Sequence, residues 1–152
     1  MSVFLKAAEQ QLIMRSHNPE KNDAGISAAI TVNGVFSEIR FKDINGQMGV
    51  CTLELVGLNI DDDMEGAMAE LVMLLNNRTE STTAIYDPNE GSLETRASVP
   101  IFEGVDLANT VEMMIVNTAV TAKNLMAMAI PVLAGVLSPG EAVVAATRRE
   151  AE

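Results

Sequence analysis

The first quarter of the chain changes from a helical to a strand-like pattern. Over residues 2–16 the apolar positions recur at intervals of four, which predicts an amphipathic helix. From residue 26 the apolar positions recur at intervals of two, as expected for a strand with one buried face. The members of these two series are Phe4, Ala8 and Leu12 in the helix, and Ile26, Ala28, Ile30 and Val32 in the strand.

Two Asn-Gly dipeptides divide the following residues into a meander. Asn33-Gly34 and Asn45-Gly46 are typical of tight hairpin turns, because both positions of such a turn need positive φ. They separate three apolar or alternating stretches, which we interpret as strands. The sequence therefore predicts three antiparallel strands, near residues 26–32, 35–42 and 51–55.

A helix, two further strands and a long helix are predicted next. Residues 61–77 carry one apolar stripe, which includes Met64, Met68 and Leu75. Strands are predicted at 82–86 and 93–99, on either side of an acidic turn that contains Pro and Gly. A long helix is expected at about 106–137, and the tail begins with Pro139-Gly140, which we interpret as helix-breaking.

This order of elements predicts the fold class. Helix, three strands, helix, two strands and long helix indicate an α+β protein with a five-stranded antiparallel sheet covered by helices. We expect residues 1–137 to form a single α+β domain. We expect residues 138–152 to be a C-terminal tail that forms no more than a loose final turn.

The apolar run at residues 125–137 raises the question of a membrane span. A span needs about 20 predominantly apolar residues. The run is shorter and contains Pro131, and extending it backwards brings in Lys123, which would cost about 3 kcal/mol near the middle of a membrane. We therefore interpret the long helix as a helix of a globular fold and predict no membrane span.

The long helix carries two apolar stripes on opposite sides. The broader one should face the sheet and contains Val111, Ile115, Ala122, Leu125, Met126, Ala129 and Leu133. The second has spacings of three, four and seven, which suit a contact between helices, and contains Met113, Val116, Val120 and Ala127. Either flanking loops or the N-terminal helix cover this second stripe, or it is a partner or dimer interface.

Composition and charge narrow the classes of partner. The chain has 152 residues, a net charge of −11, 10 methionines and one cysteine. Nucleic-acid binding needs clusters of Lys and Arg, so the charge argues against it and favours protein partners. A lone cysteine cannot form an internal disulfide, and the first residues have no apolar stretch typical of a secretion signal, so we expect a cytoplasmic protein.

No residue pattern indicates a catalytic or metal site. The cluster Asp61-Asp62-Asp63 lacks the glutamate that a calcium loop places at position twelve, and Asp62 with Glu65 is better interpreted as a helix-capping pair. His17 has no identifiable catalytic partner, and Cys51 lies within a predicted strand. We therefore predict a protein without enzymatic activity, metal or cofactor.

The order of elements resembles the type III secretion chaperone-like fold, and within it the YbjN-type family of small bacterial proteins. The local likeness lies in YDPNEGSLETRASVPIFEG at residues 86–104 and in AELVMLLNN at residues 69–77. The resemblance implies a homodimeric, non-enzymatic module that binds a protein client or a regulatory partner.

A second hypothesis is a small-molecule-binding regulator with a pocket between the sheet and the C-terminal long helix. Met68 and Met126 could line such a pocket, and packing in the core is the alternative role for both.

Overall fold

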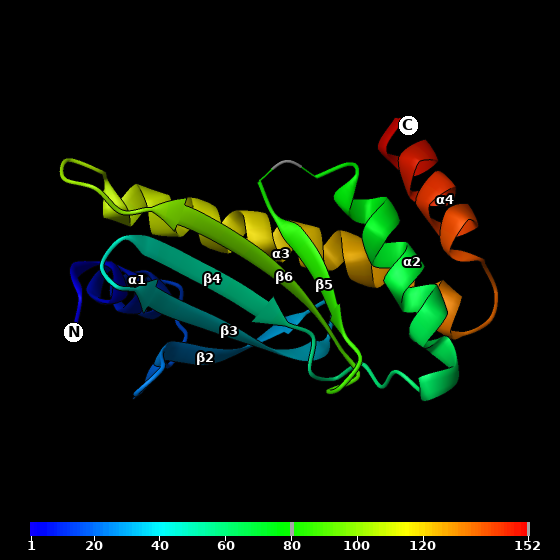
Figure 1. Ribbon diagram of the computed structural model, residues 1–152, viewed down its shortest axis with the longest axis horizontal. Helices are drawn as coiled ribbons and strands as arrows, with labels where there is room; N and C mark the ends of the chain where they lie inside the picture. The colour runs from blue at the N-terminus through cyan, green and yellow to red at the C-terminus, as the bar shows by residue number, and fades with distance from the viewer. Residues whose placement is uncertain (80, 152) are drawn as a thin grey trace.

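The computed structural model describes residues 1–79 and 81–151 (Figure 1). The elements are α1 (Val3–Met14), β1 (Glu20–Asn22), β2 (Gly25–Val32), β3 (Val35–Ile44), β4 (Met48–Glu54), the 3-10 helix η1 (Asp62–Met64), α2 (Glu65–Asn76), β5 (Thr83–Asp87), β6 (Ser92–Pro100), α3 (Leu107–Leu133) and α4 (Pro139–Ala151). The α+β class and the predicted order of the main elements are confirmed.

The sheet has six antiparallel strands, in the order β1-β2-β3-β4-β6-β5, and the prediction of five is wrong. The additional strand is β1, in which all three residues are polar and exposed. A strand that buries no side chain shows no alternation of apolar positions, so the pattern could not indicate it. Both predicted Asn-Gly turns have positive φ at each position, which confirms them.

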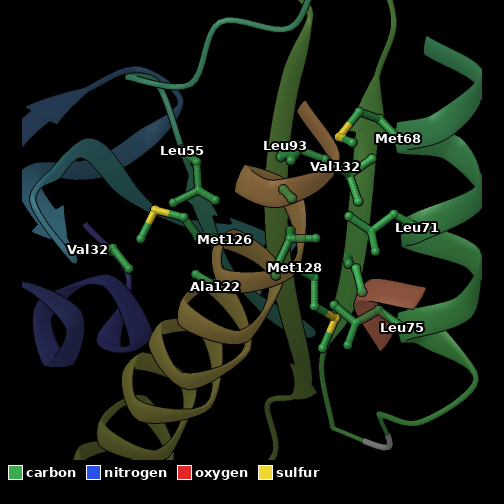
Figure 2. Packing of buried hydrophobic residues seen from close by; sticks show 14 of the residues in the cluster. Val32, Leu55, Met68, Leu71, Leu75, Leu93, Ala122, Met126, Met128 and Val132 are labelled. Carbon is green, nitrogen blue, oxygen red and sulfur yellow. The ribbon is translucent and has the colours of Figure 1, made fainter. Parts of the chain in front are cut away.

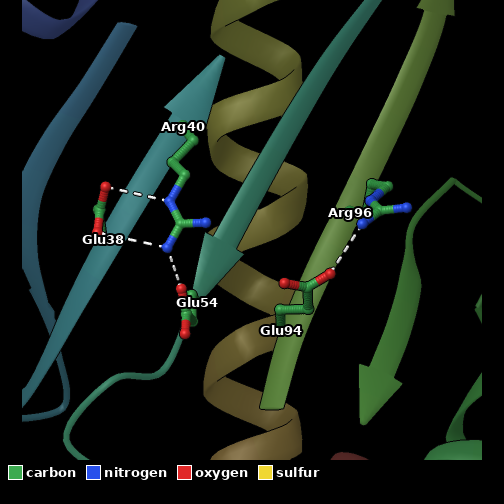
Figure 3. Close-up of polar contacts among 5 residues, drawn as sticks. All are labelled: Glu38, Arg40, Glu54, Glu94 and Arg96. Atoms are coloured by element: carbon green, nitrogen blue, oxygen red, sulfur yellow. Dashed lines mark hydrogen bonds and ion pairs between the residues drawn. The ribbon is translucent and has the colours of Figure 1, made fainter. Parts of the chain in front are cut away.

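The helices pack on one face of the sheet. On β4 and β6 the buried side chains of Cys51, Leu53, Leu93 and Ala97 all point to this face. The opposite face carries charged side chains and is left open by the helices (Figure 3). The sheet is therefore covered on one side.

Two hydrophobic clusters fill the space between the sheet and the helices. One joins α1 and the first half of α3 to the sheet and includes Phe4, Phe41 and Val111. The other joins α2, α4 and the second half of α3 to the sheet, and Figure 2 shows Met68, Leu71 and Leu75 of α2 within it, with the methionines and aliphatic residues of α3. The long helix α3 thus belongs to both clusters.

The C-terminal residues form a helix, so the prediction of a loose final turn is wrong. Pro139 is the first residue of α4, where its missing N–H removes no helical hydrogen bond. Ser138 Oγ accepts from the backbone N–H of Glu141 at 3.2 Å, and the Ser138 N–H donates to Glu141 Oε2 at 2.8 Å. Hydrogen bonding of the Glu141 carboxylate to Ser138, chiefly to its backbone N–H, lowers the pKa of Glu141. The Ser-Pro-Gly-Glu sequence therefore starts a helix, which packs on α2 and α3.

A side chain of α2 contacts the backbone of the outer strand β5. Asn76 Nδ2 donates to the carbonyl oxygen of Ala84 at 2.8 Å, and the Ala84 N–H donates to Asn76 Oδ1 at 2.7 Å. The amide of Asn76 thus forms the pair of hydrogen bonds that a neighbouring strand would form with Ala84. This contact joins the end of α2 to the sheet.

Candidate functional site

The side of α3 that faces the sheet is the one that the sequence predicts. Of the seven residues predicted to face it, Leu133 is partly buried and the other six are buried. The predicted end of the helix, near residue 137, is four residues too late, because α3 ends at Leu133 and Gly135 follows with φ 73°. The orientation of the helix agrees with the prediction.

Buried hydroxyl groups fix the rotation of α3 about its axis. Thr95 Oγ1 on β6 donates to the carbonyl oxygen of Thr118 at 2.9 Å. The hydroxyl oxygens of Thr82 and Thr121 lie 2.6 Å apart. Directional contacts of this kind tolerate little rotation, so they determine which residues of α3 face outward.

The second apolar stripe faces outward. The exposed fractions are 49% for Met113, 39% for Val116 and 51% for Val120, and Ala127 is exposed as well. Ile130 is 48% exposed and continues the same side of the helix, three residues after Ala127. We refer to these five residues as the outer stripe of α3. Because Ile130 follows Ala127 by three residues, the sequence alone could have shown that Ile130 belongs to this stripe.

Within the described residues, the N-terminal helix does not cover the outer stripe. Helix α1 packs on the sheet through its own buried residues and lies beside α3. Arg15 and Glu112 form an ion pair of 3.6 Å between the end of α1 and the first half of α3. Met14, the residue before Arg15, is 75% exposed. The structure therefore leaves the outer stripe accessible, and its role as a partner or dimer interface stays a prediction.

The open face of the sheet is dominated by paired charges. Glu38, Glu54 and Glu94 are direct neighbours on β3, β4 and β6, which alone would be repulsive (Figure 3). Arg40 pairs with both Glu38 and Glu54, and Arg96 Nη2 lies 2.9 Å from Glu94 Oε1. The hydrogen bond with Glu38 raises the pKa of the Arg40 guanidinium. These charges are compensated within the sheet, whereas exposed apolar side chains lie towards one end of the face, where Ile44 on β3 is the direct neighbour of Met48 on β4.

The helix α3 is long and apolar enough to cross a membrane by length and composition alone. Half of its most apolar window is buried inside the fold, against the sheet and the other helices. Core helices of globular proteins pass the same test. We therefore describe α3 as the central helix of the fold.

The acidic cluster forms a different local structure from the one predicted. Asp62 and Asp63 lie in the 3-10 helix η1, and neither η1 nor α2 has a side-chain hydrogen bond at its N-cap. The prediction that Asp62 and Glu65 form a capping pair is therefore wrong. Within residues 1–79 and 81–151, no three His, Cys, Asp or Glu side chains are grouped as metal ligands.

His17 and Cys51 have separate surroundings. His17 lies at a shallow surface depression with residues 29–31 and Phe36. Cys51 is buried, its Sγ is 3.7 Å from Thr118 Oγ1, and burial raises the pKa of its thiol to about 12. A thiol of this kind stays protonated and unreactive at neutral pH.

The two methionines of the ligand-pocket hypothesis are core residues. Met68 is fully buried and Met126 is 1% exposed, and both pack in the cluster around α2 and the second half of α3 (Figure 2). Both therefore have the role in core packing that is the alternative to lining a pocket.

The fold defines a class of small α+β proteins with an antiparallel sheet covered on one face by helices, and solved structures share it. YbjN from E. coli, described as a candidate transcription regulator, matches with a TM-score of 0.60 and 13% identity, over 80% of this chain and 86% of that chain. An uncharacterized protein from Methanothermobacter thermautotrophicus matches with a TM-score of 0.54 and 9% identity, over 86% of this chain and 99% of that one.

These likenesses confirm the YbjN-like fold that the sequence predicts. At such identities they concern the fold alone. No model of a known protein family matches the chain, and no curated protein matches it.

Proposed function

We propose that this chain is a non-enzymatic protein-binding module of regulatory or secretion chaperone-like type, which acts in the cytoplasm as a homodimer. The observation that carries the proposal is the outer stripe of α3, whose members Met113, Val116, Val120, Ala127 and Ile130 are all exposed on one helix. Aligned apolar residues on an exposed helix face suit contact with another protein. A second copy of the chain is the occupant that we propose for this stripe.

The charge and the fold support the regulatory part of the proposal. The shared fold with YbjN agrees with a regulatory role. A net charge of −11 disfavours direct contact with nucleic acid, so we propose that the chain acts through a protein client or regulatory partner.

The test replaces one residue of the outer stripe and measures the oligomeric state. The mass of the natural chain in solution, measured by sedimentation equilibrium at concentrations up to about 100 µM, should correspond to two copies. Val120→Lys would place a charge within the contact and should weaken dimerisation by about 30-fold or more. Circular dichroism must first show that the variant has the helix content of the natural chain.

Val144→Lys provides a matched control, because Val144 also lies on a helix and is 52% exposed, against 51% for Val120. It lies on α4, outside the outer stripe, so it should dimerise as the natural chain does. A natural chain that stays monomeric, or a folded Val120→Lys variant with undiminished dimerisation, would contradict the proposal.

A further inference from the structure

The two Asn-Gly dipeptides form turns of the same kind at the two ends of β3. Asn33 and Gly34 have φ of 48° and 80°, and Asn45 and Gly46 have φ of 54° and 68°. All four residues are exposed, and nothing lies within 4 Å of a Cβ added at either glycine. The two asparagines therefore have matched backbone conformations in open surroundings.

The two glycines differ in the hydrogen bond of the backbone N–H. The Gly46 N–H donates to Asp43 Oδ1 at 2.7 Å. In the part of the chain that the structure describes, residues 1–79 and 81–151, no group accepts a hydrogen bond from the Gly34 N–H. Thr31 stands at the position that corresponds to Asp43, three residues before the glycine. A carboxylate is a stronger acceptor than a neutral group, so only the Gly46 N–H is held firmly.

An asparagine that precedes a glycine can lose its side-chain nitrogen without an enzyme. The glycine backbone nitrogen attacks the asparagine Cγ, so that an N–Cγ bond forms and the Cγ–Nδ2 bond breaks. The proton of the glycine nitrogen leaves with Nδ2 as ammonia. Water then opens the resulting five-membered imide. Opening at Cγ gives aspartate, and opening at the main-chain carbonyl carbon gives isoaspartate, in which the chain continues through the side chain.

We propose that Asn33 is a site at which the folded protein is modified spontaneously to aspartate and isoaspartate, and that Asp43 protects Asn45 from the same reaction. The attacking nitrogen must give up its proton, and the negative carboxylate of Asp43 opposes this at Gly46. Ring closure also requires the turn to open locally, which the same hydrogen bond makes less frequent. Neither obstacle is present at Gly34. The inference goes beyond the proposed function and does not rest on it.

The modification would weaken the hairpin of β2 and β3. Isoaspartate at position 33 lengthens the main chain by one methylene within a two-residue turn, next to the directly paired Val32 and Val35. Aspartate at this position tolerates positive φ as asparagine does. Both products carry an added negative charge, and only isoaspartate disturbs the pairing of the strands.

The first test follows both asparagines in the intact, folded chain during incubation at mildly alkaline pH. Trypsin places them in separate peptides, residues 22–40 and 43–78, and mass spectrometry with fragmentation locates the modified residue. Asn33 should be modified at least about tenfold faster than Asn45. Equal rates, or faster modification of Asn45, would overturn the proposal.

The chain unfolded in urea is the reference. Both asparagines follow a β-branched residue, Val32 or Ile44, and precede glycine, so their rates should be equal once the turns are lost. A difference that persists in urea would assign the cause to the sequence and would overturn the protection by Asp43.

Two substitutions in the full chain exchange the acceptor between the turns. Asp43→Ala removes it and should speed the modification of Asn45 by about tenfold or more, with the rate at Asn33 unchanged. Thr31→Asp places a carboxylate three residues before Gly34 and should slow the modification of Asn33 by about tenfold. An unchanged rate at Asn45 in a folded Asp43→Ala chain would overturn the proposal. If Asp43→Ala fails to fold, an unchanged rate at Asn33 in the Thr31→Asp chain would do so.

The effect on the hairpin is measured on chains that have been modified and then separated by anion exchange. A methyltransferase specific for isoaspartate identifies the fraction that contains this residue. That fraction should melt at a lower temperature than the unmodified chain, whereas Asn33→Asp should melt as the natural chain does. Equal melting of the isoaspartate fraction and the unmodified chain would overturn the predicted weakening of the hairpin.

Discussion

At the scale of single residues, the contact between Gly49 and Phe4 shows how closely α1 approaches the sheet. Phe4 is 1% exposed, and its ring lies over Gly49 on β4. The ring also packs edge-on against Phe41, with 6.2 Å between the centroids. A Cβ at Gly49 would overlap the ring of Phe4, so this position needs glycine although its φ is not positive.

Gly49→Ala should lower the free energy of unfolding by about 1–3 kcal/mol, because the ring of Phe4 has to move within a packed core. Urea unfolding followed by circular dichroism measures this change. Gly66→Ala is the control, because nothing lies within 4 Å of a Cβ added in this helical position, and it should leave the stability unchanged or raise it. Equal stability of Gly49→Ala and the natural chain would contradict the described contact.

The buried thiol of Cys51 should make the free energy of unfolding depend on pH. Burial raises the pKa of its thiol from 9.0 to about 12, so above pH 9 the unfolded chain releases a proton that the folded chain retains. The contribution of Cys51 is therefore complete below pH 9 and is lost as the pH rises towards 12, by about 1 kcal/mol per pH unit. Urea unfolding at pH 8–11 should show a steeper loss of stability for the natural chain than for Cys51→Ala. Parallel curves would contradict this.

At the scale of elements, Asn76 holds the outer strand β5 to the end of α2. Ala84 is 1% exposed, so removing the amide of Asn76 takes the hydrogen-bond partner away from buried backbone groups. Asn76→Ala should therefore lower the free energy of unfolding by about 2 kcal/mol or more. Thermal unfolding checks this, with Asn77→Ala as the exposed neighbouring control. Equal melting temperatures for both variants would contradict the role of the amide.

Elements with a regular apolar period were predictable from the sequence, and elements without one were not. The strands β2 and β3 bury alternate side chains, and their turn requires the positive φ that Asn33-Gly34 supplies. The strand β1 buries no side chain, so its sequence shows no alternation of apolar and polar positions. In α4, Pro139-Gly140 suggested a break, although Ser138 and Glu141 already formed the signature of a helix start.

The candidate site was predictable as far as helical periodicity reaches. It placed Met113, Val116, Val120 and Ala127 on one side of α3, and the structure exposes all four. The packing of Leu75 on α2 near Met128 on α3 could not be predicted, because it depends on how α2 packs on α3. Periodicity identifies the faces of one helix, whereas a site between helices depends on tertiary contacts.

At the scale of the whole molecule, excess negative charge opposes the compact state. The chain has 21 acidic and 10 basic residues, and the ion pairs on the open face of the sheet compensate only part of the acidic excess. Added salt screens repulsion between exposed charges, since the Debye length falls from about 30 Å at 0.01 M to about 4 Å at 0.5 M. Stability should therefore depend on ionic strength.

Raising sodium chloride from about 0.01 M to 0.5 M should increase the melting temperature by about 2–4 °C, as screening weakens the net repulsion. Differential scanning calorimetry measures the shift. Potassium chloride at the same ionic strength is the control and should give the same shift if screening is the cause. A fall in melting temperature would instead show that the ion pairs outweigh the repulsion.

The contact of Asn76 with Ala84 also bears on how the protein behaves when it is concentrated. Fibrils grow when free strand edges add further strands. Nearly half of the residues in this sequence are hydrophobic, so exposed edges would favour such growth. One outer edge of the sheet is the short, polar β1, which pairs with residues 25–27 of β2, and on the other edge a side chain already occupies the backbone groups of Ala84. The edge at β5 thus offers a poor template for aggregation, and loss of protein during storage should follow unfolding rather than stacking of intact molecules through this edge.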